Sequence, residues 1–294
     1  MMELQTIVDI PKGKFEIEHD SKIMLLGSCF ADEMGKKFIE SGFQTMANPF
    51  GTLYNPASIA ALLLRCISRT QYEQASKEIF QAADGLWHSW MHHSRFSASQ
   101  SDTMVASLND TTAAGADFLE HADLLIVTLG TAIIYRLKET GMLVANCHKQ
   151  PDALFQRERL SVYDIVDQWQ MLLGLLRSVN PKLHVIFTVS PIRHKRDGLH
   201  INQISKGILL QAVDELLNAT DAENFISYFP SYEIMLDELR DYRFYAEDMI
   251  HPSPTAVEYI WQRFQKTYMS LQTLEKCHLR LKEWKRSQHR EIIK

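Results

Sequence analysis

The sequence lacks long apolar runs, a leader-like N-terminus and an excess of basic residues, and each absence argues against a class of protein. No run approaches the 18 apolar residues that predict a transmembrane helix, so we expect no membrane span. The N-terminus has no basic segment followed by a long apolar one, which predicts a cytoplasmic protein without a signal peptide. A formal net charge of −5 argues against a nucleic-acid partner.

Cysteine is scarce and scattered. The four cysteines are Cys29, Cys66, Cys147 and Cys277. They show no paired spacing, a pattern typical of reduced thiols and not of a disulfide framework. His92, His93 and His148, with Cys147, match no established zinc spacing. The sequence therefore predicts no metal and no other cofactor.

What the chain does contain is an alternation of short apolar runs and helical patterns. The apolar runs predict strands at 23–27, 43–47, 123–129, 184–190 and 224–228. The helical patterns fall at 30–41, 56–68, 103–120, 160–179, 198–219 and 254–272. Two of the runs are almost continuously apolar, which is typical of strands buried on both faces of a parallel sheet. The alternation predicts a doubly wound α/β/α sandwich.

No Gly/Ser linker, repeat or low-complexity tract divides the chain, so we expect a single α/β domain over residues 1–275. Two segments depart from the alternation: an aromatic- and histidine-rich insertion near 70–100 and a β-hairpin near 132–147. Residues 276–294 carry seven Lys or Arg against two Glu. We expect a basic, amphipathic C-terminal helical tail there, with a partner-binding tail as the alternative.

The first candidate site is the break between the strand at 23–27 and the helix that follows. A strand that ends at Gly27 and restarts as a helix places Ser28 and Cys29 at the carboxyl edge of the sheet. Backbone N–H groups at the start of a helix point at the same place. Acyl transfer needs an exposed nucleophile beside such donors. The alternative is that Ser28 is only a helix cap.

A second candidate lies near the other end of the chain. Asp248 and His251 form an Asp-x-x-His element before Ser253 and Pro254, which suit a helix cap and first helical position. Within one turn, the carboxylate can accept the Nδ1 proton of His251 and leave Nε2 as a base. Such spacing also occurs by chance in loops.

Further polar residues follow the predicted strands. Gly51 could lend an N–H, and Asn48 or Asn55 a side-chain amide, to an oxyanion; Asn-Pro pairs are also routine turn formers. Gly130 and Thr131 end the third strand and offer another amide.

Arg193 and His194 end the fourth strand and could bind an anionic or hydroxylated substrate, or form surface ion pairs.

Together these motifs resemble the GSCFA family, whose signature stands here as Gly27-Ser28-Cys29-Phe30-Ala31. Further blocks resemble it in order over most of residues 20–265; they are 48–56, 130–132, 147–149, 190–194 and 228–254. That family is similar to the wider GDSL/SGNH hydrolases. The resemblance implies a flavodoxin-like sandwich with a mostly parallel five-stranded sheet, and esterase, deacetylase or acyltransferase chemistry.

The match to the wider group is partial. Its nucleophilic serine corresponds to Cys29 here, with Ser28 in the aspartate position; its second-block glycine resembles Gly51. The oxyanion asparagine of its third block is missing after Gly130, and Asn55 or Asn48 is the candidate substitute.

The resemblance implies Cys29, or Ser28, as nucleophile, with His251 as general base and Asp248 as its orienter. The expected function is a hydrolase or acyltransferase that forms a covalent acyl-enzyme with a small-molecule or glycan ester such as an acylated carbohydrate. Two alternatives stay open. One is an inactive binding module on the same fold. The other is a CoA-dependent acyltransferase in which Arg193, His194 and Lys149 bind phosphates.

Overall fold

The computed structural model describes residues 6–13, 15–219 and 225–291. Its centre is a parallel sheet of five strands in the order β2-β1-β5-β9-β10. The strands are β1 (Lys22–Gly27), β2 (Gln44–Ala47), β5 (Leu124–Leu129), β9 (His184–Val189) and β10 (Ile226–Tyr228). Numbered within the sheet this is 2-1-3-4-5, the flavodoxin-like order. The predicted α/β class and all five strands are confirmed; residue 224 of the fifth lies outside the described residues.

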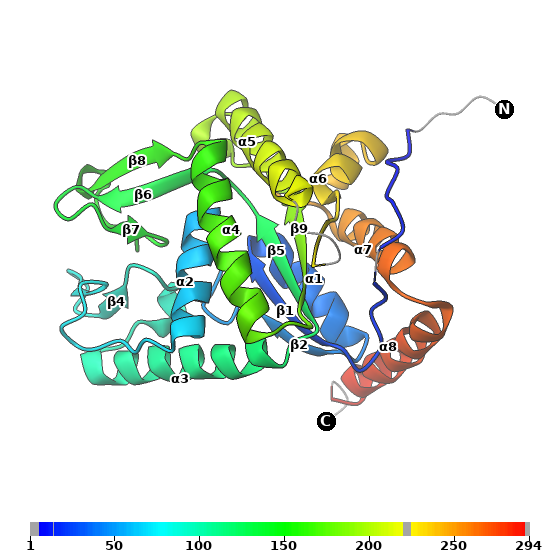
Figure 1. Cartoon of the computed structure of the whole chain (residues 1–294), viewed down its shortest axis with the longest axis horizontal. Coiled ribbons are helices and arrows are strands. Elements are labelled where there is room, and N and C mark those ends of the chain that lie inside the picture. Colours follow the sequence, from blue (N-terminus) through cyan, green and yellow to red (C-terminus); the bar gives the residue numbers. More distant parts are fainter. Residues whose placement is uncertain (1–5, 14, 220–224, 292–294) are drawn as a thin grey trace.

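Helices cover both faces of this sheet because successive strand residues point to opposite sides. Ile23 and Leu25 face one core, and Met24 and Leu26 face the other. The first core is closed by α1 (Cys29–Glu40), α7 (Pro254–Tyr268) and α8 (Leu271–Glu291). The second is closed by α2 (Pro56–Ser68), α4 (Val162–Val179) and α5 (Leu199–Asn218), with α3 (Ser101–Glu120) packed on α2. Figure 1 shows the two layers on either side of the strands.

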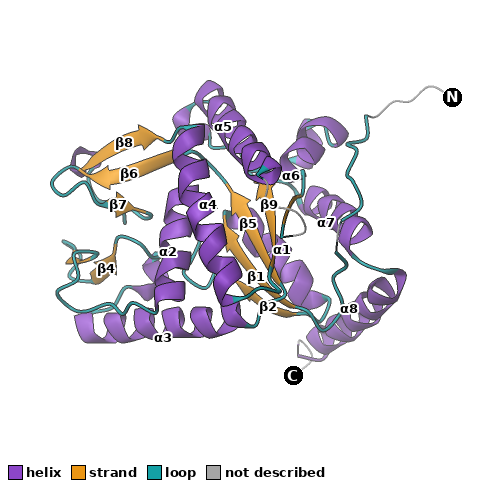
Figure 2. Cartoon of the chain, viewed as in Figure 1, coloured by secondary structure: helices purple, strands orange, loops and turns teal. Residues whose placement is uncertain are grey.

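Two small antiparallel sheets stand apart from the central one. The first joins β3 (Ile79–Gln81) to β4 (Trp87–Ser89) within the insertion near 70–100. The second has the order β7-β6-β8 and contains β6 (Ile133–Leu137), β7 (Leu143–Val144) and β8 (Phe155–Arg159). The sequence analysis missed β8, because four of its five residues are polar and no apolar alternation marks it. Both sheets lie on the side of the molecule away from α7 and α8 (Figure 2).

The C-terminal helices differ from the prediction. The helix expected over 254–272 ends at Tyr268, and α8 starts at Leu271. The break follows from two contacts: Ile17 N–H donates to Tyr268 O at 2.8 Å, and Ser270 Oγ accepts from Thr273 N–H at 3.2 Å, as a cap. The basic segment expected from residue 276 is thus part of a longer helix, and its last three residues lie outside the described ones. No described helix is both long enough and apolar enough to cross a membrane.

Candidate active site

Ser28 and Cys29 have different surroundings although they are neighbours. Ser28 is fully buried; its hydroxyl donates to Ser190 Oγ at 2.9 Å and accepts from Phe30 N–H at 3.3 Å, as the N-cap of α1. Cys29 is the first residue of α1 and is partly exposed, with Sγ 3.6 Å from Tyr54 Oη. Burial raises the pKa of the Tyr54 phenol, so this hydroxyl stays protonated and can donate to the sulfur.

The turn that presents Cys29 requires glycine. Gly27 has φ = +140°, and a Cβ there would lie 2.1 Å from Thr128 O. Ser28 N–H donates to the same Thr128 O at 3.1 Å, which brings the backbones of β1 and β5 together at their carboxyl ends. A side chain at position 27 would push this contact apart.

Cys29 lines a pocket of about 920 Å³. Its walls come from four regions: the loop after β2 with Tyr54 and Asn55, the segment around His93 in the 70–100 insertion, the small sheet with the turn at 145–152, and the segment after β9 at 194–197. The pocket therefore lies beside the carboxyl ends of the central strands, where open parallel sheets bind ligands.

Two predicted oxyanion donors are not available, which corrects the sequence analysis. Gly51 N–H donates to Asn48 O at 2.9 Å, and Gly130 and Thr131 N–H both donate to Tyr54 O at 2.8 Å. These turn contacts use the amides that were expected to face the substrate.

Asn48 is also committed to the fold. Its Oδ1 accepts from Gly27 N–H at 2.9 Å, and its Nδ2 lies 3.5 Å from Ser28 O, with the side chain buried. This asparagine stabilises the turn at Gly27 and does not line the pocket.

Asn55, by contrast, remains suited to the role of donor. Its Oδ1 accepts from Ser58 N–H at 2.8 Å as the N-cap of α2, which fixes the amide, and the residue lines the pocket. In the described chain Nδ2 has no hydrogen-bond partner. The N–H of Cys29 is a second donor, because the first amides of a helix have no acceptor within it.

Asp248 and His251 form the hydrogen bond that their spacing allows. His251 Nδ1 lies 2.6 Å from Asp248 Oδ2, while Asp248 Oδ1 accepts from the N–H groups of Ile250 and His251 at 2.8 and 3.0 Å. Together these bonds lower the pKa of Asp248 to about 2, so its charge is retained at neutral pH. The ring is thereby oriented with Nε2 free to exchange a proton.

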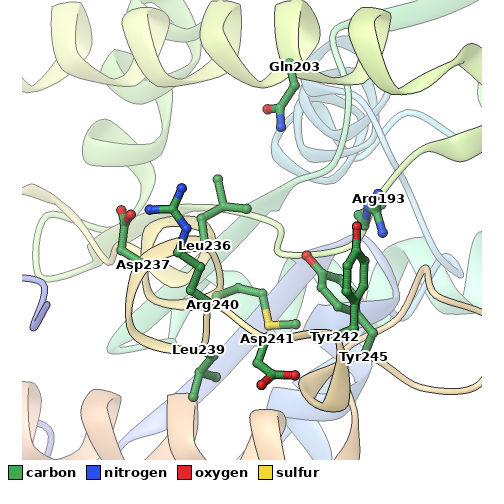
Figure 3. Close-up of a pocket in the computed structure, with 10 residues that line it drawn as sticks. Arg193, Gln203, Leu236, Asp237, Leu239, Arg240, Asp241, Tyr242 and Tyr245 are labelled. Carbon is green, nitrogen blue, oxygen red and sulfur yellow. The ribbon is translucent and has the colours of Figure 1, made fainter. Parts of the chain in front are cut away.

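Arg193 lies outside the pocket of Cys29, contrary to the expectation that it stands over the crevice. Its N–H donates to Ile250 O and its Nη1 to Met249 O, both at 3.1 Å, and its guanidinium lies 5.2 Å from the ring centroid of Tyr245. Figure 3 shows it in a separate pocket of about 460 Å³, beside Tyr242 and Tyr245. Arg193 therefore holds the loop that carries Asp248 and His251.

His194 does line the pocket with Cys29, and its ring centroid is 5.6 Å from that of Tyr54. Nε2 is buried without a hydrogen-bond partner in the described chain. Burial, with smaller contributions from Lys206 and His251, lowers the pKa of His194 to about 4, so the ring is neutral at pH 7.

Cys29 lines this pocket together with His194, whereas Asp248 and His251 are not among its described lining residues. His251 is close enough to His194 to contribute to the lowered pKa of that ring. Among the described residues the thiol has Tyr54 as its hydrogen-bond partner, and no hydrogen bond joins it to His251. Contact between the two would have to form when substrate binds, as catalytic hydrogen bonds often tighten only in the complex.

A sequence model of the GSCFA family matches residues 22–264. The chain belongs to the GSCFA family. Comparison with curated proteins gave no match. Similar solved structures include a protein from Streptococcus pneumonia provisionally described as a platelet activating factor (10% identity, 83% of this chain and 84% of that one, TM-score 0.43). Others are a carbohydrate esterase family 3 member from Talaromyces cellulolyticus (11%, 84% and 95%, 0.38) and an acetyl xylan esterase from Butyrivibrio proteoclasticus (11%, 84% and 63%, 0.34).

Two residues of this GSCFA-family site were not identified from the sequence. Tyr54 contacts the thiol, and Lys206 is buried on α5, where its Nζ donates to Gly130 O at 2.7 Å and to Ser190 O at 2.6 Å. Lys206 lies three residues before Leu209 on the buried face of its helix, and a lysine at that register was the available signal.

Thr131 lines the pocket, but its Oγ1 lies 2.9 Å from Ser205 Oγ and accepts from Ile133 N–H at 3.1 Å. Among the described residues, no group of three or more His, Cys, Asp or Glu side chains is placed to hold a metal ion.

Proposed function

We propose that this GSCFA-family protein is a cysteine-dependent ester hydrolase or acyltransferase that works through a thioester acyl-enzyme. The observation that carries the proposal is the contrast at the start of α1. Cys29 opens onto a pocket of about 920 Å³ beside the Asn55 amide, whereas Ser28 is buried and hydrogen-bonded. The thiolate is the nucleophilic form of cysteine, and the free N–H groups at the start of a helix stabilise negative charge.

In the first half-reaction, the thiolate of Cys29 attacks the acyl carbon and a C–S bond forms. The carbonyl oxygen becomes an oxyanion, and we assign its stabilisation to the N–H of Cys29, which has no acceptor within the helix, and to Nδ2 of Asn55, which lines the same pocket. The C–O bond then breaks, and His251, which holds on Nε2 the proton that the Cys29 thiol has lost, gives that proton to the departing alkoxide.

In the second half-reaction, water or an acceptor hydroxyl attacks the thioester while His251 takes its proton. The acid or the new ester leaves and the sulfur returns as thiolate. Asp248 keeps the ring oriented and stabilises the imidazolium through its 2.6 Å hydrogen bond.

The substrate class we propose is an acylated carbohydrate or a similar polar ester. The pocket carries many hydrogen-bonding side chains, among them Asn146, Gln150 and Ser94, and few large apolar ones. A CoA-type donor is less well supported, because Arg193 is turned away and Arg196, which lines the pocket, is paired with Asp152 at 3.1 Å. Lys149 lines the pocket and remains the candidate for a phosphate or carboxylate.

The test is ester hydrolysis with p-nitrophenyl acetate and acetylated sugars. Cys29→Ala should lower kcat/KM about a thousandfold or more, because it removes the nucleophile. Cys29→Ser should retain part of the activity, and Ser28→Ala, which removes a helix cap but no nucleophile, should lower it only a few fold. A fully active Cys29→Ala variant with an inactive Ser28→Ala variant would reverse the assignment of the nucleophile.

A binding module without catalysis is the competing function. It predicts no covalent labelling of Cys29 by iodoacetamide beyond that of an ordinary thiol, and no effect of His251→Ala on that labelling. An enzyme of the proposed kind should be labelled at Cys29 in preference to the other cysteines, and His251→Ala should slow the reaction.

A further inference from the structure

Lys206 is a buried ammonium without a carboxylate partner in the described part of the chain. It is 1% exposed, and its Nζ donates to Gly130 O and Ser190 O at 2.7 and 2.6 Å. These carbonyls directly follow β5 and β9, which are neighbours in the sheet. Burying an ammonium group is costly unless other groups compensate it, so its position here calls for a function.

From Lys206, one route of hydrogen bonds reaches Cys29 through the loop after β2. The carbonyl of Gly130 accepts from Lys206, and the N–H of the same Gly130 donates to Tyr54 O at 2.8 Å. The hydroxyl of Tyr54 lies 3.6 Å from Cys29 Sγ. Movement of Gly130 would therefore displace the phenol that contacts the thiol.

A second route reaches Cys29 through the helix cap. The carbonyl of Ser190 accepts from Lys206, and Ser190 Oγ accepts from Ser28 Oγ at 2.9 Å. Ser28 in turn caps α1, of which Cys29 is the first residue. Both routes start at Lys206 Nζ. The first ends at the tyrosine that contacts the thiol, and the second ends at the cap of the helix that carries it.

We propose that Lys206 is a positioning residue of the Cys29 site, which ties together the ends of β5 and β9 and, through them, the tyrosine and the helix cap that hold the thiol at the pocket. This role rests on the proposed function of Cys29.

The test compares two thiols of the same pocket. Cys29 and Cys147 both line it, but Cys147 lies on neither route. In Lys206→Met, which keeps the length of the side chain and removes both hydrogen bonds to the strand ends, the rate of iodoacetamide alkylation at Cys29 should fall about tenfold. The rate at Cys147, followed in the same sample by peptide mass spectrometry, should stay at its wild-type value. Lys182→Met, an exposed lysine at the opposite end of β9, is the matched control and should change neither rate.

Each outcome decides a different point. Equal Cys29 rates in wild type and Lys206→Met would overturn the role of Lys206 and leave the proposed function standing. A parallel change at both cysteines would show general loosening and would also overturn it. A wild-type Cys29 that is not alkylated would instead overturn the proposed function. If Lys206→Met does not fold, Ser190→Ala cuts the second route alone and should lower the Cys29-to-Cys147 ratio roughly threefold; an unchanged ratio would refute the proposal.

Discussion

At the scale of single residues, position along the first turn of a helix separates a structural hydroxyl from a reactive thiol. The hydroxyl of Ser28, which precedes α1, is used by the helix cap and by Ser190, whereas the hydrogen-bond partner of the Cys29 thiol among the described residues is Tyr54 Oη. The sequence left the choice between these two open, because both stand at the same break. The contact with Ser190, 162 positions away, favours Cys29.

The charge of Asp248 should stabilise its loop in a definite pH window. The pKa of this carboxyl in the folded state, about 2, is below its unfolded value near 3.8, so the stabilisation is complete above about pH 5 and is lost as the pH falls toward 2. We expect Asp248→Asn to unfold at lower urea concentration than wild type at pH 6, with the difference narrowing at pH 3. A difference that is independent of pH would contradict the ionic contribution.

At the scale of elements, the start of α1 does more than an ordinary helix start. Its cap is buried and bonded to a second hydroxyl from the end of β9. The cap of α4, Ser161, is by comparison exposed and forms a local capping box with Asp164. Both satisfy helix amides, but the first of these two also joins its helix to the end of β9, which lies two strands from β1 in the sheet.

Removing the two caps should therefore cost different amounts. Ser161→Ala should lower the free energy of unfolding by about 1 kcal/mol, the usual value of a cap. Ser28→Ala should cost about 1 kcal/mol more, because Ser190 Oγ then loses its buried hydrogen bond from Ser28 and keeps only the one from Ile192 N–H. Urea denaturation of both variants measures the difference, and equal losses would show that the bond to Ser190 contributes nothing.

At the scale of the whole molecule, a buried lysine links the carboxyl edge of the sheet, where the candidate site lies, to the stability of the fold. Burial lowers the pKa of Lys206 to about 7, far below its value in an unfolded chain. Between pH 7 and about 10.5 the unfolded chain binds a proton that the folded protein does not. Stability from this group therefore rises with pH over that range.

The expected slope is at most about 1.4 kcal/mol per pH unit. Measured by urea denaturation from pH 7 to 9, wild type should gain stability relative to Lys206→Met. Lys182→Met should follow the wild-type curve. If wild type and Lys206→Met change in parallel, the ammonium is not desolvated in the folded protein.

The sequence by itself determined the five strands of the central sheet, most of the helices, the turn at Gly27 and the spacing of Asp248 and His251. Each of these depends on neighbours within one element or one turn, where hydrophobic period, glycine conformation and short spacing carry the information. The strand β8 was not predicted, because four of its five residues are polar and the segment shows no hydrophobic period.

Only the tertiary structure decided which groups remain free to act. Gly51 and Gly130 follow the strands as predicted, but their N–H groups donate to the carbonyls of Asn48 and Tyr54. Arg193 donates to the loop at 249–250 and does not face the pocket. The burial of Lys206 beneath two strand ends was equally out of reach of local patterns. Which hydrogen bond a group forms depends on the partner that the fold brings near it. Here these partners come from segments far apart in the chain.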